Sequence, residues 1–171
     1  MTDVDMQDLP PMPATERRDD IGRLVALTWH GDDAVSAHYS RRWLVAVDGS
    51  ECSLRAVAMA ARLVAPVGGG EVDLVHIQPW LIKEAAETEL PRRAWVATAE
   101  ARRVLEAASV RWRLHVQMGE AATCIVSLCE KLDSRGIVIG SHGLTATESL
   151  LLGSVAYKVV HLGKLPVLIV R

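Results

Sequence analysis

The chain has 171 residues, of which half are apolar, and a formal net charge of −2. This length predicts one domain with a substantial core, and the weak negative charge argues against general nucleic-acid binding, which depends on clustered Lys and Arg. No apolar run reaches the roughly eighteen residues that a membrane span needs, and the acidic start differs from a secretory signal. Three cysteines without a C-x-x-C pair also fit a reducing compartment. We therefore predict a cytoplasmic protein with no nucleic-acid or membrane partner.

The first forty residues differ in composition from the rest. Residues 1–20 are rich in Asp and Pro and lack periodic apolar positions, so we expect a largely disordered tail. Residues 21–29 are more apolar and predict either a short element that docks on the domain or a segment that binds a partner. Docking is the favoured interpretation, because exposed apolar stretches are unusual in soluble monomers. We divide the chain into an N-terminal extension, residues 1–40, and a domain, residues 41–171.

Strand and helix patterns alternate from residue 43 onward. The apolar run at 43–47 is typical of a strand buried on both faces, and apolar residues at helical spacing follow it. In the long connection from 81 to 110, Pro91 is expected to break or restart the helix. The predicted strands are 43–47, 72–77, 113–117, 137–139 and 166–170. Alternation of this kind predicts an α/β fold with an open, mostly parallel sheet and helices on both faces.

A glycine-rich stretch follows the fourth predicted strand. Gly140 and Gly143 are followed, after nine intervening residues, by Gly153 and Ser154 just before another helical pattern. Glycine lets the backbone pack closely, and a helix N-terminus presents unpaired N–H groups and a positive dipole end to an anion. The pattern predicts a phosphate site, with a simple tight turn as the alternative.

Asp48 ends the first predicted strand and completes this prediction. If the first and fourth strands are neighbours, Asp48 and Gly140 flank one crevice at the carboxyl ends of the strands. A carboxylate suits ribose hydroxyls or a phosphate-bound metal, so the two features together indicate a nucleotide. By itself Asp48 fits a turn or a helix cap equally well. His142 is interpreted as a loop residue, since no nucleophile or carboxylate partner is identifiable, and no catalytic residue is predicted.

These motifs resemble the universal stress protein family, in its ATP-binding branch. The resemblance covers about residues 41–171 and rests on G-x-x-G, nine residues and G-[ST], with V-A-V-D-G-S at the first strand, V-H-I at the second and the closing L-P-V-L-I-V. It implies an adenine nucleotide α-hydrolase-like fold with a five-stranded parallel sheet in the order 3-2-1-4-5. It also implies ATP held across the first and fourth strands and a homodimer formed through the C-terminal strand, residues 166–170.

The resemblance also implies roles for individual residues. Ala46 and Ile77 would border the adenine, and Asp48, which follows Val47, would lie on the ribose side and near a nucleotide-bound Mg²⁺. The remaining predicted contacts are to the ribose and inner phosphate (Gly140, Ser141, His142, Gly143) and to the outer phosphates (Gly153, Ser154, Val155). Many relatives carry Lys or Arg between the second and third glycines, but residues 144–149 of this chain include Glu148 and no cation. ATP, ADP and AMP therefore all remain candidate ligands, with or without Mg²⁺.

The function predicted from the sequence is that of an adenine-nucleotide-binding universal stress protein. It would act as a stress-response sensor or regulator whose dimer behaviour or unidentified protein partner changes with nucleotide state. One alternative is a nucleotide-free dimeric interaction module. The other, less favoured, is an ATP-hydrolysing enzyme of the same fold, and the sequence predicts slow hydrolysis at most.

Overall fold

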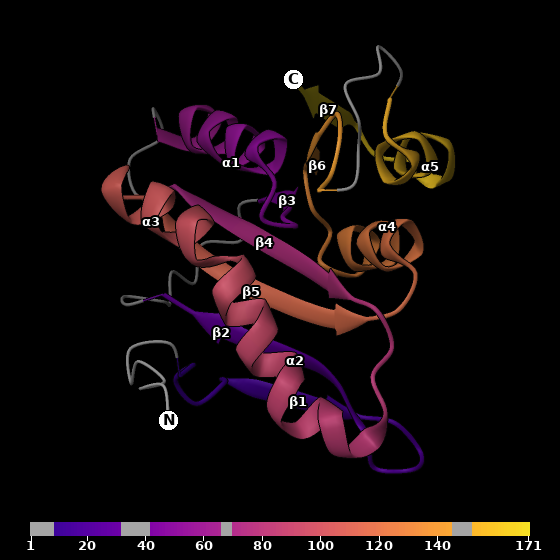
Figure 1. Cartoon of the computed structure of the whole chain (residues 1–171). Helices are drawn as coiled ribbons and strands as arrows, with labels where there is room; N and C mark the ends of the chain where they lie inside the picture. Colours follow the sequence, from indigo (N-terminus) through magenta and orange to yellow (C-terminus); the bar gives the residue numbers. More distant parts are fainter. Residues whose placement is uncertain (1–8, 32–41, 66–69, 145–151) are drawn as a thin grey trace.

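A computed structural model describes residues 9–31, 42–65, 70–144 and 152–171, in which strands and helices alternate along most of the chain (Figure 1). The strands are β1 (Thr15–Arg18), β2 (Leu24–His30), β3 (Trp43–Ala46), β4 (Glu71–Gln78), β5 (Arg111–Met118), β6 (Gly136–Gly140) and β7 (Val167–Val170). The helices are α1 (Glu51–Val64), α2 (Lys83–Ala97), α3 (Ala99–Ala107), α4 (Ala121–Lys131) and α5 (Ser154–Leu162). The fold is α/β, as predicted.

All described strands belong to one sheet, in the order β1-β2-β5-β4-β3-β6-β7. The segment from β5 to β7 is parallel and contains the predicted order 3-2-1-4-5. The predicted number of strands is wrong, because β1 and β2 extend the sheet to seven strands at the β5 edge. Strand β2 pairs antiparallel with β5, and β1 pairs antiparallel with β2.

The N-terminal region therefore contributes to the sheet. The expectation of disorder over residues 1–20 is wrong for Thr15–Arg18, whose side chains are all exposed and which form a strand by backbone pairing with β2. The expected docking element at 21–29 lies largely within β2, whose alternate residues enter the core. Residues 1–8 and 32–41 lie outside the described residues, and the division at residue 41 stays a prediction.

Helices cover both faces of the sheet. Buried residues of α1, α2 and α3 pack with one set of strand side chains, and those of α4 and α5 pack with the set on the opposite face. Figure 1 shows α1, α2 and α3 along one side and α4 and α5 on the other. On the first face, Trp29, Trp95 and Trp112 form an aromatic cluster, with ring centroids 5.6 and 6.5 Å apart in successive pairs. None of the helices in the described ranges is long and apolar enough to cross a membrane.

Helix α2 continues through Pro91, so the predicted break at that residue is wrong. Proline lacks one N–H donor, but the helix keeps its buried face against the core through Ala86, Leu90 and Ala94. The helical direction changes instead at Thr98, where φ is −104° and ψ is 3°. The hydroxyl of Thr98 donates to the carbonyl of Ala94 at 2.8 Å, and the N–H of Thr98 donates to the same carbonyl at 3.1 Å.

A buried carboxylate lies on the α4 face of the sheet, in β4. Asp73 is 1% exposed and accepts hydrogen bonds from Arg113 Nε at 2.8 Å and from His115 Nε2 at 3.0 Å. Burial by itself raises the pKa of Asp73, but the hydrogen bonds and charges of His115 and Arg113 outweigh it and hold this pKa below its ordinary value of 3.8. Asp73 is therefore ionised within a fully paired cluster.

Candidate functional site

A cavity of about 410 Å³ opens at the carboxyl ends of the parallel strands. Strand β3 lies between β4 and β6, so the chain winds toward β5 in one half of the sheet and toward β7 in the other. Such a reversal leaves a crevice between the strand ends, where ligands of open α/β sheets bind. The structure brings every predicted site residue together there: Ala46, Val47, Asp48, Ile77, Gly140, Ser141, His142, Gly143, Gly153, Ser154 and Val155 all line the cavity.

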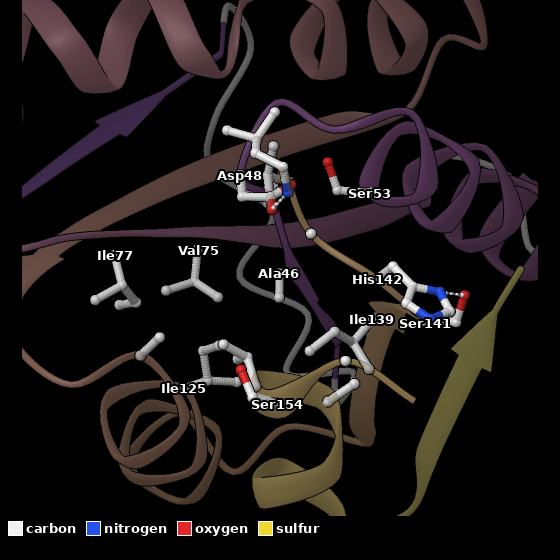
Figure 2. Close-up of a pocket in the computed structure, with 18 residues that line it drawn as sticks. Ala46, Asp48, Ser53, Val75, Ile77, Ile125, Ile139, Ser141, His142 and Ser154 are labelled. Atoms are coloured by element: carbon white, nitrogen blue, oxygen red, sulfur yellow. Dashed lines mark hydrogen bonds between the residues drawn. The ribbon is translucent and has the colours of Figure 1, made fainter. Parts of the chain in front are cut away.

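The floor of the cavity is apolar. Ala46 of β3 pairs with Val75 of β4, and Ile77 follows on the same face. Figure 2 shows these three side chains in a row, with Ile139 of β6 beyond Ala46 and Ile125 of α4 opposite the row. A flat apolar surface between strand ends and a helix is the kind of lining that accepts an aromatic ring.

Asp48 connects the two loops that border the cavity. Its Oδ1 accepts from the backbone N–H of Ser50 at 2.9 Å, and its Oδ2 accepts from that of Leu144 at 3.1 Å. A Cβ at Gly143 would lie 2.6 Å from Oδ2, so only glycine lets the second loop approach this carboxylate so closely. A carboxylate offers about four acceptor positions, which leaves capacity for a ligand hydroxyl.

The start of α1 packs directly on the end of β6. A Cβ at Gly140 would lie 2.7 Å from the backbone carbon of Cys52, so a larger residue would push the helix away from the strand. The helix is held there by its N-cap, since the hydroxyl of Ser50 accepts from the N–H of Ser53 at 3.2 Å. The glycine thus brings the β3 and β6 loops to one opening.

The phosphate-side wall is built from backbone. The N–H of Gly153 donates to the carbonyl of Ser141 at 2.8 Å, and the N–H of Ser141 donates to Val170 at 2.7 Å. A Cβ at Gly153 would lie 3.0 Å from that Ser141 oxygen and 3.3 Å from the Cα of His142. Gly153 caps α5 without a side-chain hydrogen bond, so the first N–H groups of α5 are available to an anion.

Positive charge at this wall comes from the helix end rather than from side chains. Among the described residues that line the cavity there is no Lys or Arg, and Asp48 is the one carboxylate. Residues 145–151, which include Glu148 of the predicted phosphate loop, lie outside the described residues. Over the parts that are described, no group of three or more His, Cys, Asp and Glu side chains could hold a metal ion by itself. Any Mg²⁺ at Asp48 would take most of its ligands from phosphate and water.

The sequence model of the universal stress protein family matches residues 40–171. The chain belongs to the universal stress protein family. Universal stress protein YxiE of Bacillus subtilis is 27% identical over 146 residues, which cover 76% of this chain and 98% of that protein.

Solved members of the family have the same fold. A universal stress protein in complex with cAMP has 25% identity and a TM-score of 0.64, and the match covers 77% of this chain and 97% of that chain. A universal stress protein from Archaeoglobus fulgidus in complex with dAMP has 23% identity and a TM-score of 0.62, and covers 78% and 100%.

The cavity of this universal stress protein domain has further lining residues that the sequence interpretation did not assign to the site. They are Ser53, Val75, Ala121, Ile125, Ile139, Leu144 and Ala156. Ile125 repeats at helical spacing with the core residues of α4, so its pattern is that of an ordinary inner helix face. Position in the sequence could have identified Ala121 and Ile125, because they lie at the start of the helix that follows the end of β5.

Proposed function

We propose that this universal stress protein binds an adenine nucleotide in the cavity at the strand ends and acts as a nucleotide-dependent regulator. The observation that carries the proposal is the combination, in one cavity, of an apolar floor, a carboxylate and a glycine-lined backbone wall that leads into α5. Each part suits one part of a nucleotide: the base, the ribose and the phosphate. The complexes of two family members with cAMP and dAMP support the same ligand class.

In this arrangement the adenine lies on the floor between Ala46 and Ile77. The ribose hydroxyls reach Asp48, and the inner phosphate contacts the backbone of residues 140–143. The N–H groups of Ser154 and Val155, at the start of α5, receive the next phosphate, while the N–H of Gly153 stays bonded to Ser141. The wall supplies no cationic side chain in the described residues. We therefore propose that its backbone N–H groups bind a single phosphate group, and that ADP and ATP depend on Mg²⁺ for tight binding. Calorimetry with AMP, ADP and ATP, each with and without Mg²⁺, ranks the three ligands directly.

Replacing Asp48 with Ala should weaken the affinity for AMP about ten- to a hundredfold, because a charge-assisted hydrogen bond to the ribose is lost. The change also releases the N–H of Leu144, so Asp48→Asn, which keeps one acceptor oxygen, should have an intermediate effect. Glu84→Ala, at an exposed carboxylate in the first turn of α2, is the matched control and should bind AMP normally. Equal AMP affinity in Asp48→Ala and the control would mean that Asp48 does not contact the bound nucleotide.

We also propose that two chains associate through β7. This strand ends the sheet and pairs on one side with β6, so its other edge is open among the described residues. The carbonyls of Pro166 and Val170 bond to β6, so by alternation the N–H and C=O of Ile169 point to the open edge. Exposed apolar side chains lie on β7 and on α5, the helix that precedes it, namely Tyr157, Val160, Leu162 and Ile169.

Replacing Ile169 with Pro should shift the protein from dimer toward monomer in sedimentation velocity experiments. Proline removes the outward N–H donor but leaves the bonds of β7 to β6, since these come from the neighbouring residues. Ile169→Val keeps the donor and an apolar side chain and should remain dimeric. A dimer of unchanged stability in the Pro variant would place the interface elsewhere.

The two alternatives make different predictions about bound nucleotide. A nucleotide-free interaction module would bind none of AMP, ADP and ATP and would carry none after purification, which mass spectrometry of the released ligand measures. An ATP-hydrolysing enzyme would turn over bound ATP. The histidine that lines the cavity, His142, lies 3.0 Å from the hydroxyl of Ser141 through Nδ1. His142→Gln should therefore lower any hydrolysis rate if this ring acts as a base.

A further inference from the structure

A second groove lies on the same face of the sheet as the nucleotide cavity. Its volume is about 200 Å³, and its walls come from β1, β2, β5 and the C-terminal half of α4. Helix α4 separates the two hollows: Ala121 and Ile125 line the nucleotide cavity, whereas Leu128, Lys131 and Leu132 line the groove. The groove exists because β1 and β2 extend the sheet past α4.

The strand register shows which side chains form the floor. Thr28 of β2 lies opposite His115 of β5, and Ala26 lies opposite Gln117. On the other side of β2, Thr15 and Arg17 of β1 pair with Thr28 and Ala26, so their side chains share this face. The floor is therefore polar, with hydroxyl, amide and imidazole groups.

Two cations line the groove without an ion-pair partner among the described residues. Arg62 on α1 also forms no ion pair there, whereas nine other described arginines pair with carboxylates: Arg18, Arg23, Arg42, Arg55, Arg92, Arg93, Arg103, Arg111 and Arg113. Arg17 and Lys131 form no ion pair and no side-chain hydrogen bond with the described residues, yet both line this groove. Burial raises the pKa of the Cys124 thiol on α4 and the charge of Arg17 opposes that rise, which agrees with a guanidinium close to the helix.

The carboxylates near the groove do not cancel this charge. Asp73, beneath His115, is already paired with Arg113 and His115. Glu16 borders the groove through β1, but its carboxylate pairs with Arg18 at 3.3 Å. Two unpaired cations next to threonine hydroxyls suit a dianionic group, and a phosphate carries about −1.5 to −2 charges at pH 7 with several acceptor oxygens.

We propose that this groove is a second ligand site, which binds the phosphate group of a small phosphorylated molecule between Arg17 and Lys131. The N-terminal strands β1 and β2 thereby supply a binding function of their own, separate from the nucleotide cavity. Arg17 contributes a planar donor fork from the sheet edge, Lys131 contributes a point charge from α4, and the Thr15 and Thr28 hydroxyls donate from the floor.

The test is titration of the full chain with inorganic phosphate, followed by backbone amide shifts in two-dimensional NMR. The Gly153→Val variant serves as the background, because its blocked nucleotide cavity leaves the groove as the remaining phosphate site. We expect saturable shifts at residues 15–17, 26–28, 115–117 and 128–132. Arg17→Gln and Lys131→Gln should each weaken phosphate binding about three- to tenfold, and the double variant by more. Arg62→Gln, at an exposed arginine in the last turn of α1, is the matched control and should leave the affinity unchanged.

The outcomes separate the alternatives. Shifts at the groove that disappear in the double variant, with unchanged dispersion of the other signals, support the proposal. If phosphate shifts only residues 140–144 and 152–156 of the wild-type protein, or shifts nothing, the groove is not a phosphate site. Equal loss of affinity in the Arg62→Gln control would mean a general effect of net charge and would also overturn the proposal.

Discussion

Replacing Gly153 with Val should abolish measurable adenine-nucleotide binding, a loss of affinity of at least about a hundredfold. The added Cβ would press on the Ser141 carbonyl at 3.0 Å and on the Cα of His142 at 3.3 Å, and both of these are backbone atoms. The remaining methyl groups would lie where the phosphate approaches the first turn of α5. The φ of Gly153 is −61°, which any residue adopts, so the effect arises from lost space rather than from backbone strain.

Two controls make this result specific. Gly153→Ala adds the Cβ alone and should cause a smaller loss, so affinity should fall in the order Gly, Ala, Val. Ala107→Val adds the two methyl groups by which Val exceeds Ala, at an exposed position at the end of α3, and should bind nucleotide normally. Calorimetry measures the affinities, and thermal unfolding checks that each variant is folded. Tight AMP binding by a folded Gly153→Val protein would exclude the backbone wall as the phosphate site.

Replacing Asp73 with Asn should lower the free energy of unfolding at pH 7 by about 3 kcal/mol, because Arg113 loses the carboxylate that neutralises it on a buried sheet face. The isosteric change keeps the volume, so the loss reports charge and hydrogen bonding. Because the pKa of Asp73 is lower in the folded protein, its contribution is fully present above the ordinary value of 3.8 and is lost as pH falls through the folded value. Wild type and variant should therefore converge in stability in strong acid.

Urea denaturation at several pH values measures this effect. Glu100→Gln removes one partner of the exposed pair with Arg103 on α3, and should change the free energy of unfolding by less than about 1 kcal/mol. A loss for Asp73→Asn as small as that of the control, or a loss that persists unchanged below the acid transition, would mean that the cluster does not stabilise the fold through the Asp73 charge.

The parallel half of the fold could be predicted because its signals are local. The central strands β3 and β6 carry apolar runs buried on both faces, and glycines stand where a Cβ would meet backbone, at the end of β6 (Gly140) and at the start of α5 (Gly153). The same positions define the cavity, which explains why every predicted site residue lies in it. The roles of those residues toward a nucleotide stay predictions.

The two N-terminal strands were not predicted from local sequence patterns. Thr15–Arg18 contains four exposed polar residues, and only its pairing with β2 makes it a strand. Strand β2 did carry a signal, since Val25, Leu27 and Trp29 alternate with less apolar residues, but its position in a polar region favoured a docking segment. Pro91 illustrates the opposite error, because burial of the surrounding helix face outweighs a single missing donor.

The two backbone hydrogen bonds accepted by Asp48 have a consequence for the energetics of recognition. They fix the loops after β3 and β6 relative to each other within the protein itself. The conformational entropy of bringing these loops together is therefore lost during folding and not on encounter with a ligand. An incoming nucleotide meets Asp48, Ser50 and Leu144 already held together, so bringing these residues together should not limit its association rate.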